Sequence, residues 1–160
     1  MKAVSVNQLK KELVTCNVDE LVELCLRLSK FKKENKELMT YLLFEASDEI
    51  GYVESVKLEI DTHFANINTN SFFYIKKSVR KILRLINKFS RYSLKKETEV
   101  ELLLHFCNKL KALKPSIKHN VTLMNIFHRQ LAKIKKMVLT LHEDLQYDYQ
   151  IEIDRLESAI

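Results

Sequence analysis

A chain of 160 residues, 46% of them hydrophobic, is long enough to bury a core, and its formal net charge is +6. It contains one glycine, Gly51, and one proline, Pro115. Phosphate-binding loops of the G-x-x-x-x-G-K-[ST] type, dinucleotide fingerprints and nucleophile elbows each need at least two glycines, so these nucleotide-binding and hydrolase classes are excluded.

The same shortage of turn residues predicts the fold class. Short strands need frequent turns that lean on glycine, proline and asparagine, whereas long runs without the first two indicate long helices. We therefore expect an all-α fold, with residues 1–160 forming a single-domain antiparallel bundle or array of about six or seven helices.

The N-terminal region predicts short helices between residues 5 and 31. Ser5 is suited to cap the first of them, and Asn17 or Asp19 to open the second. In the second, apolar side chains recur at helical spacing on one side: Leu21, Leu24, Cys25 and Leu28. A third helix begins near Glu34. It either continues through Gly51 into the next segment or breaks over residues 47–51, a break that the glycine favours because it costs about 1 kcal/mol inside a helix.

A polar linker, residues 66–71, precedes a predicted basic helix over residues 71–92. Another helix follows at about 96–113, with glutamates in its first turn that suit the positive end of the helix dipole. A long C-terminal helix is expected over 116–157. Its apolar residues follow a heptad seam: Met124, Phe127, Leu131, Ile134, Val138, Leu141 and Leu145. The partner of this seam is either another helix of the same chain or a second chain, so self-association or a protein partner through helix 116–157 is one hypothesis.

From these patterns we expect core residues in both the N-terminal and the C-terminal parts of the chain. It includes Leu24, Leu28, Leu42, Val79, Ile82, Ile86, Leu103, Phe106, Leu131, Ile134 and Val138.

Charge is distributed unevenly along the chain. Residues 62–141 carry seventeen basic and three acidic side chains, a net charge of +14, whereas residues 142–160 carry one basic and six acidic side chains. Residues 72–96 hold nine Lys or Arg and no Asp or Glu. A concentration of one sign on this scale creates a strong local field.

On a helical wheel, the cations of the basic helix fall on the side opposite its apolar residues. The predicted polyanion-binding residues are Lys77, Arg80, Lys81, Arg84, Lys88 and Arg91. Three readings remain open: a structural face neutralised by the acidic C-terminus, a nucleic-acid surface, or a surface for an acidic protein or a membrane. In the nucleic-acid reading, Tyr74 and Tyr92 are candidates to stack on exposed bases, although tyrosines at such positions are more often amphipathic residues at the edge of the core.

Catalytic and metal sites find little support in the sequence. Two pairs, Glu59/His63 and Glu101/His105, share a helix face, but their Glu-x-x-x-His spacing differs from the Glu-x-x-His of di-iron bundles. We predict no metal, no cofactor and no catalytic residue, and expect that the chain is not an enzyme. The three cysteines include no C-x-x-C pair, which is typical of reduced thiols in a cytoplasmic protein.

No uncharged apolar run approaches the ~20 residues of a membrane span, and no signal peptide is apparent. The sequence therefore predicts a non-enzymatic helical interaction or scaffold protein of the cytoplasm. The alternative is a nucleic-acid-binding protein that uses the basic face of helix 71–92 for phosphate contacts.

Overall fold

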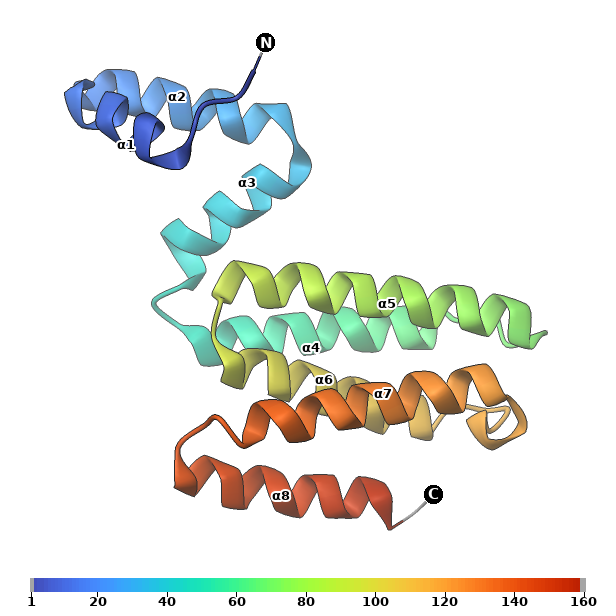
Figure 1. Cartoon of the computed structure of the whole chain (residues 1–160). Coiled ribbons are helices and arrows are strands. Elements are labelled where there is room, and N and C mark those ends of the chain that lie inside the picture. The colour runs from blue at the N-terminus through green and yellow to red at the C-terminus, as the bar shows by residue number, and fades with distance from the viewer. Residues whose placement is uncertain (1, 159–160) are drawn as a thin grey trace. The chain divides into compact units, whose positions relative to one another are not determined.

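The computed structural model describes residues 2–158, and these are helical apart from short connections (Figure 1). The all-α class is confirmed, with eight α-helices in the described residues where about six or seven were expected. The chain divides into two compact units, one ending at Phe44 and the other beginning at Glu45. The single domain over residues 1–160 stays a prediction.

The N-terminal unit contains three α-helices: α1 (Val6–Thr15), α2 (Val18–Phe31) and α3 (Lys33–Thr40), followed by a π-helical turn, Tyr41–Glu45. Both expected caps are confirmed. The Ser5 side chain accepts a hydrogen bond from the backbone N–H of Gln8, and Asn17 accepts one from that of Glu20. In each helix the side chain at the third helical position, Gln8 or Glu20, accepts a hydrogen bond from the backbone N–H of the cap residue. The first turn of each helix is therefore stabilised by local contacts.

The N-terminal unit has almost no core. None of the residues of α1, α2 and α3 is buried, and Leu24, Leu28 and Leu42 are 41%, 59% and 59% exposed. The prediction that these three leucines belong to the core is wrong. Helical spacing indicated an apolar side on α2, but nothing within so small a unit covers that side.

The C-terminal unit has five α-helices: α4 (Glu49–Ala65), α5 (Phe72–Ser93), α6 (Lys96–Lys111), α7 (Val121–Val138) and α8 (Glu143–Glu157). A 3₁₀ turn, Ile117–His119, precedes α7. Helix α6 is central, because it packs against each of the other four. The expected core residues of this unit are buried, which confirms them: Val79, Ile82, Ile86, Leu103, Phe106, Leu131, Ile134 and Val138.

The break before α4 falls where Gly51 favoured one. Residues 46–48 are not helical, and the Asp48 side chain caps α4 by accepting a hydrogen bond of 3.0 Å from the backbone N–H of Gly51. A Cβ atom at position 51 would lie 2.4 Å from the carboxylate of Asp48. Any other residue at this position would require the Asp48 side chain to shift.

The long C-terminal helix expected over 116–157 is wrong, because the chain turns back between α7 and α8 (Figure 1). The Thr140 hydroxyl donates to the Met137 carbonyl, and His142 caps α8 through its Nδ1 atom. Four of the five seam residues of α7, from Phe127 to Val138, are buried within the chain, where α7 packs against α6 and α8, and Met124 is half-buried. A continuous 116–157 surface for a second chain therefore does not exist.

Among the described residues, none of the helices combines the length and the apolar composition that crossing a membrane requires.

Candidate functional site

Helix α5 presents its cations on the surface because its apolar stripe is fixed in the core. Ile75, Val79, Ile82 and Ile86 are at most 1% exposed. Helices α4 and α6 pack on this stripe, so the rotation of α5 about its axis is set by burial. Side chains on the opposite side of α5 are therefore held toward solvent.

The structure places five of the six predicted polyanion-binding residues in exposed positions. Lys77, Arg80, Lys81, Arg84 and Arg91 are exposed, and none of them forms an ion pair with another described residue. Lys88 differs: its side chain is half-buried and its Nζ lies 4.5 Å from the centre of the Phe89 ring.

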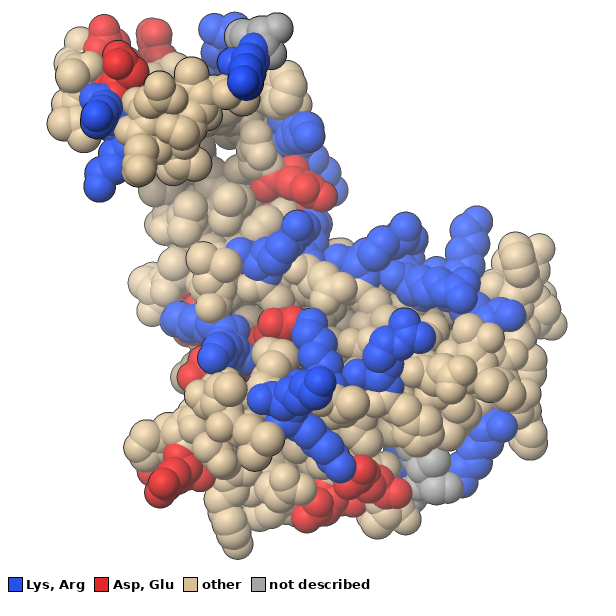
Figure 2. All heavy atoms as spheres, in the orientation of Figure 1, with Lys and Arg blue, Asp and Glu red and all other residues tan. Residues whose placement is uncertain are grey.

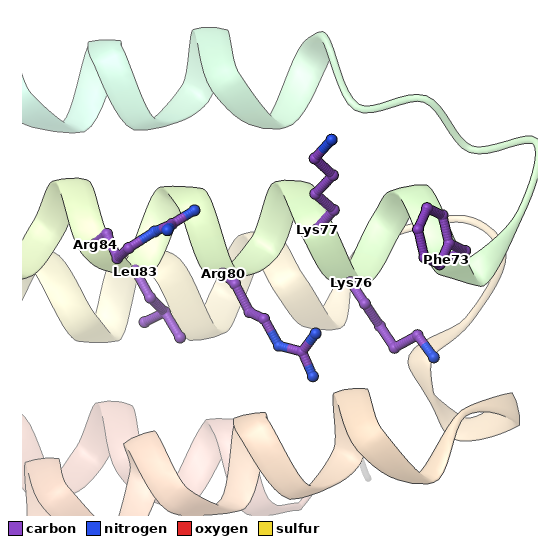
Figure 3. Close-up of a pocket in the computed structure, with 6 residues that line it drawn as sticks. All are labelled: Phe73, Lys76, Lys77, Arg80, Leu83 and Arg84. Carbon is purple, nitrogen blue, oxygen red and sulfur yellow. The ribbon is translucent and has the colours of Figure 1, made fainter.

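The exposed cations do not form one continuous site. Three of them, Lys77, Arg80 and Arg84, line a groove of 640 Å³ that also includes Lys76. Phe73 and Leu83 supply the apolar part of its wall, and no acidic side chain lines it. We call this surface the α5 groove. In Figure 3, Lys76 and Arg80 extend to one side of α5 and Lys77 to the other, so the cations flank the helix.

Arg91 belongs to a second hollow, of 470 Å³, at the corner between α5 and α6. Its lining residues are Asn87, Ser90, Arg91, Leu94, Lys95, Lys96, Glu99 and Lys133. Much of the charge here is already paired, since Lys95 lies 3.1 Å from Glu49 and Lys133 forms an ion pair with Glu99. Of the two hollows, only the α5 groove offers cations without a nearby carboxylate.

The acidic C-terminus does not neutralise the basic helix in this fold. Helix α8 packs against α6 and α7, and its Glu157 pairs with Lys135 of α7 at 2.6 Å. No ion pair joins a described residue of α8 to the five exposed cations of α5. Figure 2 shows Lys and Arg gathering over α5, while Asp and Glu gather over α8. Among the described residues, ion pairs therefore do not support the reading in which the acidic C-terminus neutralises the basic helix.

A polar cluster joins α4 to α6 and involves one of the predicted histidine pairs. The Asp61 carboxylate of α4 contacts two side chains of α6. Its Oδ1 atom lies 2.5 Å from Nε2 of His105, and its Oδ2 atom lies 2.7 Å from Nζ of Lys109. The ion-pair partner of His105 is thus an acid on the neighbouring helix and not Glu101, with which it shares a helix face. The other pair, Glu59 and His63, lies within 3.9 Å.

The pKa shifts in this region follow from these pairings. Partial burial of Asp61 acts to raise its pKa, but hydrogen bonds from Lys109 and His105 outweigh it and lower the pKa below its usual value. Partial burial of Lys57 acts to lower its pKa, and hydrogen bonds to Glu54 and Glu101 outweigh that and raise it. Each of these ionised groups therefore has an oppositely charged partner within the fold.

The cysteines are all free thiols. Cys107 is buried in α6, and this burial raises the pKa of its thiol to about 12. Among the described residues, His, Cys, Asp and Glu side chains form no group of three that could hold a metal ion.

Sequence reasoning missed Phe73 and left two roles open for the tyrosines. Phe73 is 67% exposed and lines the α5 groove, and Tyr74 is 47% exposed beside it. Tyr92 is only 8% exposed, which agrees with the core role and leaves it unavailable to stack on bases. A large aromatic residue in the first turn of an otherwise basic helix, next to a polar linker, was the available signal for Phe73.

No protein-family model matches this chain, and neither do any curated protein or solved structure.

Proposed function

We propose that the chain is a non-enzymatic interaction protein whose α5 groove binds nucleic acid through its phosphates. The observation that carries this proposal is a set of four cations, Lys76, Lys77, Arg80 and Arg84, in one groove that no carboxylate lines. These side chains form no ion pair with another described residue. A bound phosphate backbone supplies the missing counter-charge.

Repulsion between like charges within α5 supports the proposal that its basic face binds an anionic ligand and does not serve only to contact water. Arg80 and Arg84 are one helical turn apart, as are Lys77 and Lys81. Like charges at this spacing each cost roughly 0.2–0.5 kcal/mol, which a surface helix usually avoids by mixing signs. Phosphates placed between these cations convert repulsion into attraction, and arginine forks bind phosphate oxygens in a bidentate manner.

The polar clusters elsewhere support a binding role rather than catalysis. Glu101 accepts hydrogen bonds from Lys57 and Tyr149, and Asp61 is held by Lys109 and His105. These carboxylates anchor α6 to α4 and α8, so their bonding capacity is used in joining helices. We include a cytoplasmic location in the proposal, on the support of three free thiols.

The proposal is tested with the double variant Arg80→Gln plus Arg84→Gln. We expect the wild-type chain to bind a labelled oligonucleotide with an affinity whose logarithm falls linearly with the logarithm of salt concentration, at a slope of about −3 to −5. The double variant should bind at least about tenfold more weakly near 0.1 M salt, with a slope shallower by about 1–2. Its melting temperature should equal or slightly exceed that of wild type, because both side chains are exposed and their mutual repulsion is removed.

The matched control is Arg27→Gln plus Arg155→Gln, which removes the same total charge from exposed positions on α2 and α8. It should leave affinity within about twofold of wild type. Equal losses in the two double variants would reduce the effect to overall charge and overturn the α5 groove as the site. Absence of binding at low salt by the wild-type chain would overturn the proposed function itself.

A further inference from the structure

Phe73 projects an exposed aromatic ring at the end of the cationic groove. Its side chain is 67% exposed, although it belongs to a helix whose other face is fully buried. The ring of Tyr74, 47% exposed, lies 5.5 Å away in an edge-to-face arrangement. Two adjacent exposed aromatic rings beside a row of cations combine an apolar platform with a site for negative charge.

We propose that the α5 groove binds single-stranded nucleic acid, with an unpaired base stacked on Phe73 and the neighbouring phosphates held by Lys76, Lys77, Arg80 and Arg84. This inference rests on the proposed function and adds the strand type that the groove selects. An aromatic ring and a basic groove are the two elements that proteins combine to hold single strands, since every base offers a flat face to an aromatic side chain.

The spacing along α5 supports one continuous path. Lys76 and Lys77 follow Phe73 by three and four residues, and Arg80 and Arg84 by seven and eleven, so all five are attached to one broad face of the helix. Lys77 extends toward one edge of that face and Lys76 and Arg80 toward the other. At the helical rise, Phe73 and Arg84 lie about 16 Å apart along the axis. Figure 3 shows Phe73 at the start of α5 with the cations following it along the helix.

A duplex uses the cations but gains little from the ring. Its bases are paired and stacked on one another, so their faces are not available to Phe73, whereas an unpaired base exposes its face. Removal of a stacking aromatic side chain typically weakens single-strand binding by roughly fivefold to a hundredfold. Preference for single strands should therefore depend on Phe73, and the overall attraction to phosphate should not.

The experiment compares three probes with the full chain at equal salt: an unstructured single-stranded oligonucleotide, a duplex of the same length, and polyphosphate, which has no bases. Phe73→Leu keeps an apolar side chain and removes the ring. The control, Phe31→Leu, makes the same change at a phenylalanine that is 76% exposed in α2.

We expect wild type to bind the single strand about tenfold more tightly than the duplex. Phe73→Leu should lose at least about fivefold in single-strand affinity, with unchanged duplex and polyphosphate affinity and an unchanged salt slope. Phe31→Leu should behave as wild type.

Each contrary result is informative. Equal binding of single strand and duplex, together with no effect of Phe73→Leu, would overturn this inference while leaving the proposed phosphate-binding function in place. A loss of polyphosphate binding as large as the loss of single-strand binding would show that the ring acts without stacking, and would also overturn it. No binding of any probe at low salt would overturn both proposals.

Discussion

Ser90 is a buried side chain of α5 whose hydroxyl lacks a hydrogen-bond partner within the described part of the chain. The residue is 6% exposed and lies in the wall of the hollow at the α5–α6 corner. A buried hydroxyl without a partner loses its bonds to water on folding and gains nothing in exchange. Its presence therefore lowers the stability of the C-terminal unit.

Replacement of Ser90 by alanine should stabilise the chain. We expect Ser90→Ala to raise the free energy of unfolding by about 1 kcal/mol more than the same change at Ser78, which is half-buried in the same helix. Ser78→Ala includes the same gain in helix propensity, so the difference between the two free energies of unfolding reports the effect of removing the buried hydroxyl. Urea denaturation measures both values. A lower stability of Ser90→Ala than of Ser78→Ala would mean that the hydroxyl has a favourable partner.

At the scale of single residues, the sequence predicted the direction of side chains well and their surroundings poorly. The period of α5 placed Arg80 and Arg84 on the exposed side. It did not predict that Lys88 lies over the Phe89 ring or that Tyr92 is buried, because both depend on neighbouring residues brought in by folding. The division of the cations between the α5 groove and the corner hollow likewise needed the positions of α6 and α7.

Tyr149 attaches α8 to α6. The residue is buried, and its hydroxyl donates a hydrogen bond of 3.4 Å to Glu101. Burial, reinforced by repulsion from the Glu101 carboxylate, raises the pKa of Tyr149 far above its usual value near 10. The folded chain therefore holds the proton that the unfolded chain releases above pH 10.

This shift predicts that the docking of α8 weakens in alkali. Above about pH 10 the unfolded state binds fewer protons than the folded state, so the free energy of unfolding falls as pH rises, in part through this residue. Tyr149→Phe should remove that part of the fall between pH 9 and pH 11 in urea denaturation. Tyr147→Phe, at a position 71% exposed on the same helix, should retain it. Identical pH profiles for the two variants would contradict the prediction.

At the scale of helices, the sequence predicted beginnings better than ends. Caps at Ser5 and Asn17 were recognisable because the capping contacts are local. The end of α7 was not, because residues 139–142 contain neither glycine nor proline and the apolar seam continues through Leu141 and Leu145. The chain turns there so that α8 covers α6 and α7, a gain that comes from residues far away in the sequence.

The two units differ sharply in how much of their surface is buried. Helices α1, α2 and α3 contain no buried residue, whereas α6 alone contains eight. Stability against local opening depends on buried apolar contacts, so it should be concentrated in the C-terminal unit. This difference was hidden in the sequence, because the apolar spacing of α2 resembles that of helices that are buried.

Hydrogen exchange measured by mass spectrometry should separate the two units. We expect backbone amides of α1–α3 to exchange at least about a hundredfold faster than those of α6, which corresponds to a difference of about 2.7 kcal/mol in opening free energy. The measurement should be made over a tenfold range of protein concentration. Equal protection of the two units would contradict this prediction. Protection of α1–α3 that rises with concentration would instead show that a second copy covers their apolar residues.

The central position of α6 also sets the order in which the chain can fold during synthesis. Helices α4 and α5 precede it, yet each buries part of its apolar face against α6. At 5–20 residues per second, the ribosome needs roughly 2–9 s to extend the chain from the end of α4 at residue 65 to Leu110 near the end of α6. During that interval the apolar residues that α4 and α5 bury against α6 lack this cover, although the two helices can still pack on each other. The nascent chain therefore exposes apolar surface, a condition that favours aggregation, until α6 has emerged.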